Sequence, residues 1–257
     1  MSKVVVIKVG SSLVTDSNDS IDKEFIRSVS SQIRDLVEKG FEVTVVSSGA
    51  IAHGMKSWGI KKKPKEIDRL QALSAVGQIG LINAYQDEFR IHGLLAAQVL
   101  MSHGDFKDKD RSKNIKTSLK NIFSLGAIPI INENDSVSTE EIEFGDNDQL
   151  SGNVAKLICS DLLIILTDQD GVFDKNPTMN KNAKLLNEIK FTNVDKLEIE
   201  FGKAGEYGRG GMKTKLLAAE NYLNPNNKMY IANGKSENIL LDILSENRVG
   251  TVIRLAN

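Results

Sequence analysis

Residues 4–12 read Val4-Val5-Val6-Ile7-Lys8-Val9-Gly10-Ser11-Ser12. The apolar run over 4–9 is typical of a strand buried inside a sheet. Lys8 interrupts that run, and because lysine is rarely buried without a partner, a functional lysine is favoured over one that reaches solvent. Gly10 and the two serines allow the backbone to approach an anion closely while offering N–H groups. The stretch therefore predicts a buried strand that ends at an anion-binding loop.

Along the rest of the chain, further short apolar runs alternate with longer segments of helical period. Such alternation predicts an α/β fold, a three-layer αβα sandwich with a mostly parallel central sheet. We see no repeat, low-complexity segment or linker, so we expect a single domain over 1–257. Further strands are expected at 41–46, 94–100, 127–131, 162–166, 229–231 and 251–255, helices at 25–37, 67–89, 115–125, 147–159, 212–223 and 237–244, and a projecting hairpin at 136–144.

Composition narrows the function classes. The 33 basic and 34 acidic residues give a formal net charge of -1, which argues against a nucleic-acid partner. No run approaches the ~20 apolar residues of a membrane span, and the N-terminal apolar run is too short for a signal peptide. We therefore expect a cytoplasmic protein with no membrane partner.

Cys159 is the only cysteine, which excludes an intramolecular disulfide and a cysteine-rich zinc site. It follows an apolar helical stretch, so we expect a small buried hydrophobe.

Polar residues follow several of the predicted strands. Ser48-Gly49 follows the second strand, 132–135 the fourth, and Thr167-Asp168 the fifth. In open α/β sheets, ligands bind beyond the carboxyl ends of the strands. These residues therefore indicate one site assembled from several loops.

A second glycine-rich segment, 208–215, opens a predicted helix and reads Gly-Arg-Gly-Gly-Met-Lys-Thr-Lys. Flexible backbone, a positive helix end and fixed cations suit a polyphosphate, although such glycines also occur in plain loops. The segment is not a Walker A loop, and the dinucleotide fingerprint is missing from the chain.

Asp146-Asn147-Asp148 stands at the start of another predicted helix. One carboxylate or amide is enough to cap a helix, so the additional polar groups favour a functional role. The three histidines lack metal-ligand spacing.

Four of these motifs resemble the amino-acid kinase family, and the resemblance extends along nearly the whole chain. Residues 167–177, Thr-Asp-Gln-Asp-Gly-Val-Phe-Asp-Lys-Asn-Pro, are similar to the nucleotide-side motif that the family shares. Residues 47–51, 131–135 and 145–151 together look like those of the members that phosphorylate glutamate.

The resemblance implies a role for each matching residue. Lys8 and Lys215 would contact the transferring phosphoryl oxygens, and Asp148 would hold both lysines. L-glutamate would be bound in the N-terminal part of the domain by Ser48, Asp135 and Asn147. ATP with Mg²⁺ would be bound in the C-terminal part, and the metal ligands are left unassigned. The implied ATP-binding residues are Lys8, Gly10, Thr167, Asp168, Arg209, Gly210, Gly211, Met212, Lys213, Thr214 and Lys215.

The implied reaction is attack of the γ-carboxylate of glutamate on the γ-phosphorus of ATP, the first step of proline biosynthesis. A glutamate side chain has a pKa near ~4.3, so no general base is required. The resemblance also implies proline as a feedback inhibitor, and we expect a homo-oligomer. Two features depart from the family pattern. Glu143 stands where many relatives carry a basic residue, and many relatives carry a C-terminal domain resembling an RNA-binding fold, whereas this chain ends at Asn257.

Three alternatives remain open. The chain could phosphorylate aspartate, N-acetylglutamate or a nucleoside monophosphate, or serve as a non-catalytic ligand sensor on the same fold. A nicotinamide-dependent oxidoreductase is disfavoured by the missing fingerprint. Residues 202–211 are our candidate for a mobile lid.

Overall fold

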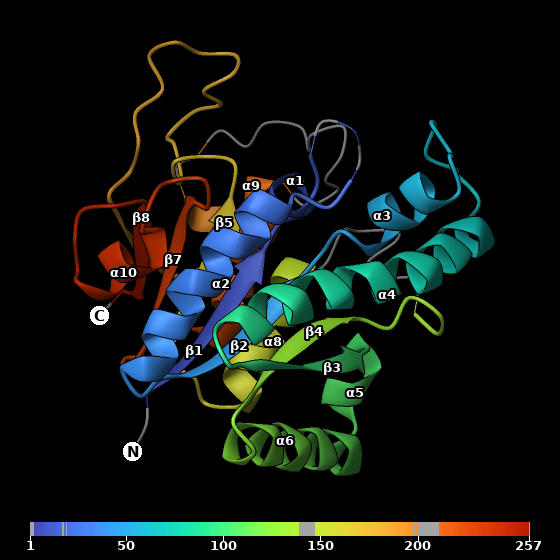
Figure 1. The fold of residues 1–257 in the computed structure, drawn as a ribbon. Helices are drawn as coiled ribbons and strands as arrows, with labels where there is room; N and C mark the ends of the chain where they lie inside the picture. Colours follow the sequence, from blue (N-terminus) through green and yellow to red (C-terminus); the bar gives the residue numbers. More distant parts are fainter. Residues whose placement is uncertain are drawn as a thin grey trace.

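A single sheet runs through the molecule in the strand order β3-β4-β2-β1-β5-β7-β8-β6 (Figure 1). The computed structural model describes residues 3–16, 18, 20–138, 147–197, 199 and 211–256. Every neighbouring pair of strands is parallel except β7 and β8. The strands are β1 (Val4–Val9), β2 (Glu42–Ser47), β3 (Leu95–Met101), β4 (Ala127–Glu133), β5 (Leu162–Thr167), β6 (Glu188–Phe191), β7 (Lys228–Asn233) and β8 (Thr251–Leu255).

Helices cover both faces of this sheet (Figure 1). On β1, Val5, Ile7 and Val9 face a core shared with α2, α4 and α10, whereas Val6 faces a core shared with α6, α8 and α9. The predicted three-layer sandwich is thus confirmed. The helices are α1 (Ser11–Val14), α2 (Lys23–Glu38), α3 (Ala50–Ser57), α4 (Ile67–Ile91), α5 (His103–Lys107), α6 (Lys109–Ser124), α8 (Asn147–Leu157), α9 (Met212–Tyr222) and α10 (Ile239–Leu244), with a 3₁₀ turn, η1 (Val194–Lys196).

The differences from the predicted elements have local causes. Helix α6 begins well before the predicted residue 115, because the Asp108 side chain caps it by accepting hydrogen bonds from the N–H groups of Asp110 and Arg111. Its first turns are polar, so they lack the helical spacing of apolar residues on which the prediction relied. Strand β6 was not predicted, because it has only four residues.

The prediction for Cys159 was wrong. Helix α8 ends at Leu157, and Cys159 has the left-handed φ of 55° and is exposed rather than buried. Its Sγ lies 3.8 Å from Lys116 Nζ. The apolar residues before it suggested a longer helix, but the chain turns there to enter β5.

Two predicted segments fall largely outside the described residues. Of the hairpin predicted at 136–144, residues 139–144 lie outside them, and of the lid predicted at 202–211, residues 202–210 do. None of the helices in the described part of the chain has the length and hydrophobicity that a membrane span requires.

Helices α3 and α4 pack at backbone distance, because glycines stand where they cross. A Cβ added to Gly77 of α4 would lie 1.8 Å from the carbonyl oxygen of Ala50, the first residue of α3. A Cβ added to Gly54 of α3 would lie 1.9 Å from the carbonyl oxygen of Leu73. This contact fixes the start of α3, and with it the loop that follows β2, against α4.

We predict that Gly77→Ala lowers the free energy of unfolding by about 1–3 kcal/mol or more, because a methyl group there overlaps backbone that cannot yield freely. Chemical denaturation measures this change. Gly104→Ala is the matched control, since Gly104 is also helical and the nearest atom to an added Cβ lies 3.8 Å away. Equal stabilities of the two variants would contradict the close contact.

Candidate active site

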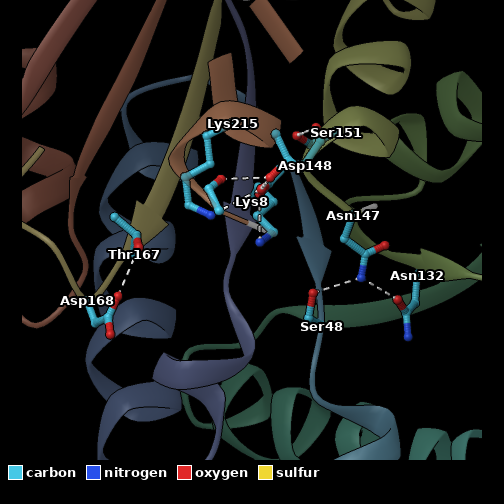
Figure 2. A network of polar contacts seen from close by, with 11 residues as sticks. Lys8, Ser48, Asn132, Asn147, Asp148, Ser151, Thr167, Asp168 and Lys215 are labelled. Carbon is cyan, nitrogen blue, oxygen red and sulfur yellow. Dashed lines mark hydrogen bonds and ion pairs between the residues drawn. The ribbon is translucent and has the colours of Figure 1, made fainter. Parts of the chain in front are cut away.

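A buried ion triad lies at the carboxyl end of the central strands (Figure 2). Lys8 Nζ lies 2.8 Å from Asp148 Oδ1, and Lys215 Nζ lies 3.1 Å from Asp148 Oδ2. The side chains of Lys8, Asp148 and Lys215 are 6%, 1% and 9% exposed. Two ammonium groups against one carboxylate give the triad a formal excess of positive charge.

The three residues meet because of how their elements are placed. Lys8 follows Val6 on the alternating face of β1 that looks toward α8 and α9. Asp148 and Lys215 lie in the first turns of those two helices, so both positive helix ends also point toward the site. A Cβ added to Gly152 would lie 2.8 Å from the carbonyl oxygen of Ala218, so the two helices approach closely just beyond the ion pair.

Asp148 remains ionised although it is fully buried. Burial by itself would raise its pKa, but attraction to Lys215 and Lys8 and hydrogen bonds from Lys8 and Thr214 outweigh burial and hold the pKa well below its usual range. Thr214 Oγ1 lies 2.8 Å from both Asp148 Oδ2 and the carbonyl oxygen of Gly211, so its one proton serves one acceptor at a time. The carboxylate is thus a permanent anchor for both lysines.

A chain of side-chain amides lies beside the triad, toward β2 and β4 (Figure 2). Asn147, the neighbour of Asp148, donates from Nδ2 to Ser48 Oγ and to Asn132 Oδ1, both at 2.8 Å. Asn132 Nδ2 in turn donates to Gln78 Oε1 at 2.8 Å. The structure therefore brings the predicted residues Ser48 and Asn147 into direct contact.

Asp135 is held from α4 instead. Ser74 Oγ donates to Asp135 Oδ2, and Gln71 Nε2 donates to the backbone oxygen of Asp135 at 2.8 Å. The other carboxylate oxygen, Oδ1, is buried and has no hydrogen-bond partner among the residues that the structure describes. Burial raises the pKa of Asp135 to about 6, against the opposing hydrogen bond from Ser74.

The opposite side of the triad is formed by the end of β5. Thr167 Oγ1 donates to Asp168 Oδ1 at 3.2 Å, and Gly10 N donates to the backbone oxygen of Leu166 at 3.2 Å. A Cβ added to Gly10 would lie 3.7 Å from Lys8 Nζ, so the backbone of Gly10 lies close to the ammonium group. Because β1 lies between β2 and β5, Lys8 stands between the Ser48 side and the Thr167 side (Figure 2).

The glycine-rich segment before α9 is described only in part. Gly211 caps α9 without a side-chain hydrogen bond, and Met212 packs partly buried against the core. Lys213 turns away from the triad and pairs with Asp195 at 3.4 Å. Arg209 and Gly210, which were predicted to bind ATP, and Glu143 lie outside the described residues.

Sequence reasoning missed the α4 residues Gln71, Ser74 and Gln78 and gave Asn132 no role of its own. The sequence held a signal for these α4 residues, because all three are polar and adjoin the apolar stripe of the helix. Ser74 and Gln78 are only 4% and 6% exposed, and buried polar groups need partners.

The donor set suits anions more than a protein-held metal. No group of three or more His, Cys, Asp or Glu residues that could hold a metal ion occurs within the described ranges. Mg²⁺ is commonly held by one or two carboxylates together with substrate phosphates, and Asp168 is an exposed carboxylate beside the triad. Two lysines and two helix ends can neutralise a polyphosphate and an approaching carboxylate together.

The arrangement is that of a phosphotransferase built on an αβα sandwich. Comparison of the sequence with known protein families agrees with this class. A model of the Amino acid kinase family matches residues 3–233. The chain belongs to the amino acid kinase family.

More specific similarity is found among curated proteins. Glutamate 5-kinase from Burkholderia cenocepacia (strain HI2424) is 46% identical over 251 residues, which are 97% of this chain and 67% of that protein. Glutamate 5-kinase from Hydrogenovibrio crunogenus (strain DSM 25203 / XCL-2) is 39% identical over 248 residues, which are 96% of this chain and 66% of that protein. The chain thus spans about two thirds of the length of these relatives.

Solved structures share the fold at lower identity. An isopentenyl phosphate kinase from T. acidophilum matches with a TM-score of 0.65 and 20% identity, over 98% of this chain and all of that one (100%). A UMP kinase from Bacillus anthracis matches with a TM-score of 0.66 and 19% identity, over 98% of this chain and 96% of that one. At these identities the likeness concerns the fold alone.

We predict that Asp148→Asn lowers the free energy of unfolding by about 3–5 kcal/mol, because it removes the charge of the carboxylate that both buried ammonium groups contact. Denaturant titration measures the loss. Asp195→Asn is the matched control, since it also removes a lysine partner but its side chain is 82% exposed, and we expect near wild-type stability. A near wild-type Asp148→Asn protein would contradict the anchoring role of the carboxylate.

Proposed function

We propose that this chain is a glutamate 5-kinase, which transfers the γ-phosphoryl group of ATP to the γ-carboxylate of L-glutamate and forms an acyl phosphate and ADP. This reaction begins proline biosynthesis. The observation that carries the proposal is the buried triad of Lys8, Asp148 and Lys215, placed between the Thr167 side and the Ser48 side of the site. Relatives named glutamate 5-kinase that match almost the whole chain support the same acceptor.

The chemistry requires charge neutralisation rather than proton abstraction. The γ-carboxylate is already ionised at neutral pH, so it can attack phosphorus directly. The obstacle is repulsion between a carboxylate and a polyphosphate. Lys8 and Lys215 lie within hydrogen-bonding distance of one carboxylate, and we assign both to the oxygens of the transferring phosphoryl group, where negative charge must be balanced. Asp148 is assigned as the residue that aims them.

The acceptor side offers groups that match a free amino acid. Ser48 Oγ accepts a hydrogen bond from Asn147 Nδ2, so its own hydroxyl proton remains for donation to a carboxylate. Asp135 Oδ1 is an acceptor for an ammonium group. N-acetylglutamate lacks that ammonium group, and nucleoside monophosphates lack both the ammonium group and the carboxylate. Aspartate carries both, and the relatives named glutamate 5-kinase favour glutamate over it. A non-catalytic sensor would have no need of Lys8 and Lys215 beside these acceptor groups, so their presence argues against that alternative.

The nucleotide side is assigned to ATP with Mg²⁺. Mg²⁺ bound to the β- and γ-phosphates would add positive charge to that of the lysines. Asp168 is the residue we assign beside the metal, with Thr167, Gly10 and the start of α9 facing the phosphates. Residues 209–211 complete this assignment by resemblance to the family.

Three wider assignments accompany this function. We propose that residues 1–257 form one domain, with acceptor groups contributed mainly by its N-terminal part and nucleotide groups by its C-terminal part. We also propose a homo-oligomer. Leu95 and Leu100 on the open edge strand β3 are 54% and 41% exposed, and Ile91 nearby in sequence is 69% exposed, which suits burial against a second copy. Feedback inhibition by proline remains a prediction from the family resemblance.

The direct test is glutamate-dependent release of ADP, with the acyl phosphate trapped by hydroxylamine as its hydroxamate. Aspartate, N-acetylglutamate and UMP are assayed in parallel at equal concentration. We expect hydroxamate and ADP in equal amounts with glutamate and little of either with the other three. ADP release that depends on one of the others instead would replace the proposed acceptor.

We predict that Lys8→Ala and Lys215→Ala each lower kcat by about 100–1000-fold while the protein stays folded, since each removes a preorganised group that stabilises developing charge. Steady-state kinetics measures the loss, and circular dichroism checks the fold. Lys190→Ala is the control, because Lys190 pairs with Glu188 at 2.8 Å on the exposed face of β6. Wild-type turnover in either active-site variant would remove the assigned role.

Asp135 predicts a pH dependence of acceptor use. Its pKa is raised to about 6, so the ionised form that attracts an ammonium group is lost as pH falls through that value. We expect kcat/KM for glutamate to fall by roughly tenfold per pH unit below about 6, because this ratio reports the free enzyme. Asp135→Asn should raise KM for glutamate far more than KM for ATP and abolish this fall of kcat/KM at low pH. If the fall is unchanged in that variant, another group causes it.

A further inference from the structure

Helix α4 carries a row of polar side chains directed at the acceptor side of the site. Gln71, Ser74 and Gln78 are spaced i, i+3 and i+7, so they lie on one face of the helix. Ser74 and Gln78 are buried, and each contacts a residue in or just after β4. We call these three residues the α4 polar row.

The two ends of the row reach two different groups of the site. Gln71 and Ser74 hold Asp135, one through its backbone oxygen and the other through Oδ2. With Oδ2 occupied by a donor, the carboxylate presents Oδ1 as its remaining acceptor. The hydroxyl of Ser74 therefore decides which oxygen of Asp135 is directed at a ligand.

Gln78 acts through a relay of amides. Asn132 Oδ1 accepts from the backbone N–H of Glu133 at 2.9 Å and from Asn147 Nδ2 at 2.8 Å. This turns Asn132 Nδ2 toward α4, where Gln78 Oε1 accepts from it at 2.8 Å. Asn147 Nδ2 also donates to Ser48 Oγ, and this leaves the Ser48 hydroxyl proton for another acceptor. Gln78 thus holds the α4 end of a relay of three hydrogen bonds that leads to Ser48.

The helix that carries the row is itself fixed to both loops. Gly77 lies against Ala50 at the start of α3, and Tyr85 OH lies 3.0 Å from Ser47 Oγ at the end of β2. The row at positions 71–78 contacts the end of β4 and the loop after it. A shift of α4 would therefore move both acceptor-binding loops together.

We propose that Ser74 and Gln78 are positioning residues. They hold one hydrogen-bond acceptor, Asp135 Oδ1, and one hydrogen-bond donor, the Ser48 hydroxyl, in the arrangement that selects a zwitterionic amino acid as the substrate to be phosphorylated. This inference rests on the proposed function and adds residues that act through Asp135 and Ser48. The ammonium group of the substrate meets Asp135 Oδ1, and a substrate carboxylate meets the Ser48 hydroxyl.

The first test separates positioning from stability. Ser74→Ala and Gln78→Met should each raise KM for glutamate about tenfold, with kcat and KM for ATP within about twofold of wild type. Ser74→Thr restores the hydroxyl and should restore KM. Gln86→Met is the matched control, because Gln86 is also an α4 glutamine whose Oε1 accepts from Ala96 N, away from the site. We expect it to lower thermal stability and leave KM for glutamate unchanged.

The second test asks whether Ser74 acts through Asp135. In an Asp135→Asn background, Ser74→Ala should add less than about twofold to KM for glutamate, because the residue it positions is already altered. Fully additive effects would contradict the inference, as would an unchanged KM for glutamate in both Ser74→Ala and Gln78→Met, or equal increases in KM for ATP. Failure of the wild-type protein to release ADP with glutamate would refute the proposed function itself, and is recognised before any variant is compared.

Discussion

The structure depends on one buried interaction, the attachment of Lys8 and Lys215 to Asp148. Two ammonium groups would repel each other inside a protein, and a single buried carboxylate would lose its charge. Together they are stable, and the carboxylate holds both ammonium groups at one place in the site. The close approach of α8 and α9 at Gly152 and Ala218 is the packing feature that makes this geometry possible. The function that we propose uses these two ammonium groups to let two anions meet.

The site is organised by the sheet, with β1 in the centre and different tasks on its two sides. Toward β2 and β4 lie the amides and the carboxylate that we assign to the acceptor, and α4 holds them in place. Toward β5 lie Thr167, Asp168 and the start of α9, which we assign to the nucleotide. Lys8 stands where the two sides meet, near the end of a strand that is buried from Val5 onward. A parallel sheet places all these strand ends at one edge, which explains why residues far apart in the chain converge.

Much of this arrangement was predictable from sequence, because its signals are local. The lysine within an apolar strand and the glycines before α9 both stand out, and the structure brings Lys8, Lys215 and Asp148 together. The polar residues Gln71, Ser74 and Gln78 beside the apolar stripe of α4 were visible in the sequence. Their partners, among them Asn132, were not predictable, since they depend on which face of a helix meets which strand end. The long α6 and the exposed Cys159 were missed because a capping side chain and a left-handed turn, rather than hydrophobic period, determine where those helices start and stop.

A crystal structure with ADP, Mg²⁺, glutamate and aluminium fluoride would test the central claim most directly. Aluminium fluoride imitates the transferring phosphoryl group, so the complex reports which groups surround it. We predict that it binds between the glutamate γ-carboxylate and the β-phosphate of ADP, with the ammonium groups of Lys8 and Lys215 both within hydrogen-bonding distance of its fluorine atoms. Binding at another part of the molecule, or a complex in which either lysine contacts Asp148 but not the fluoride, would contradict the account.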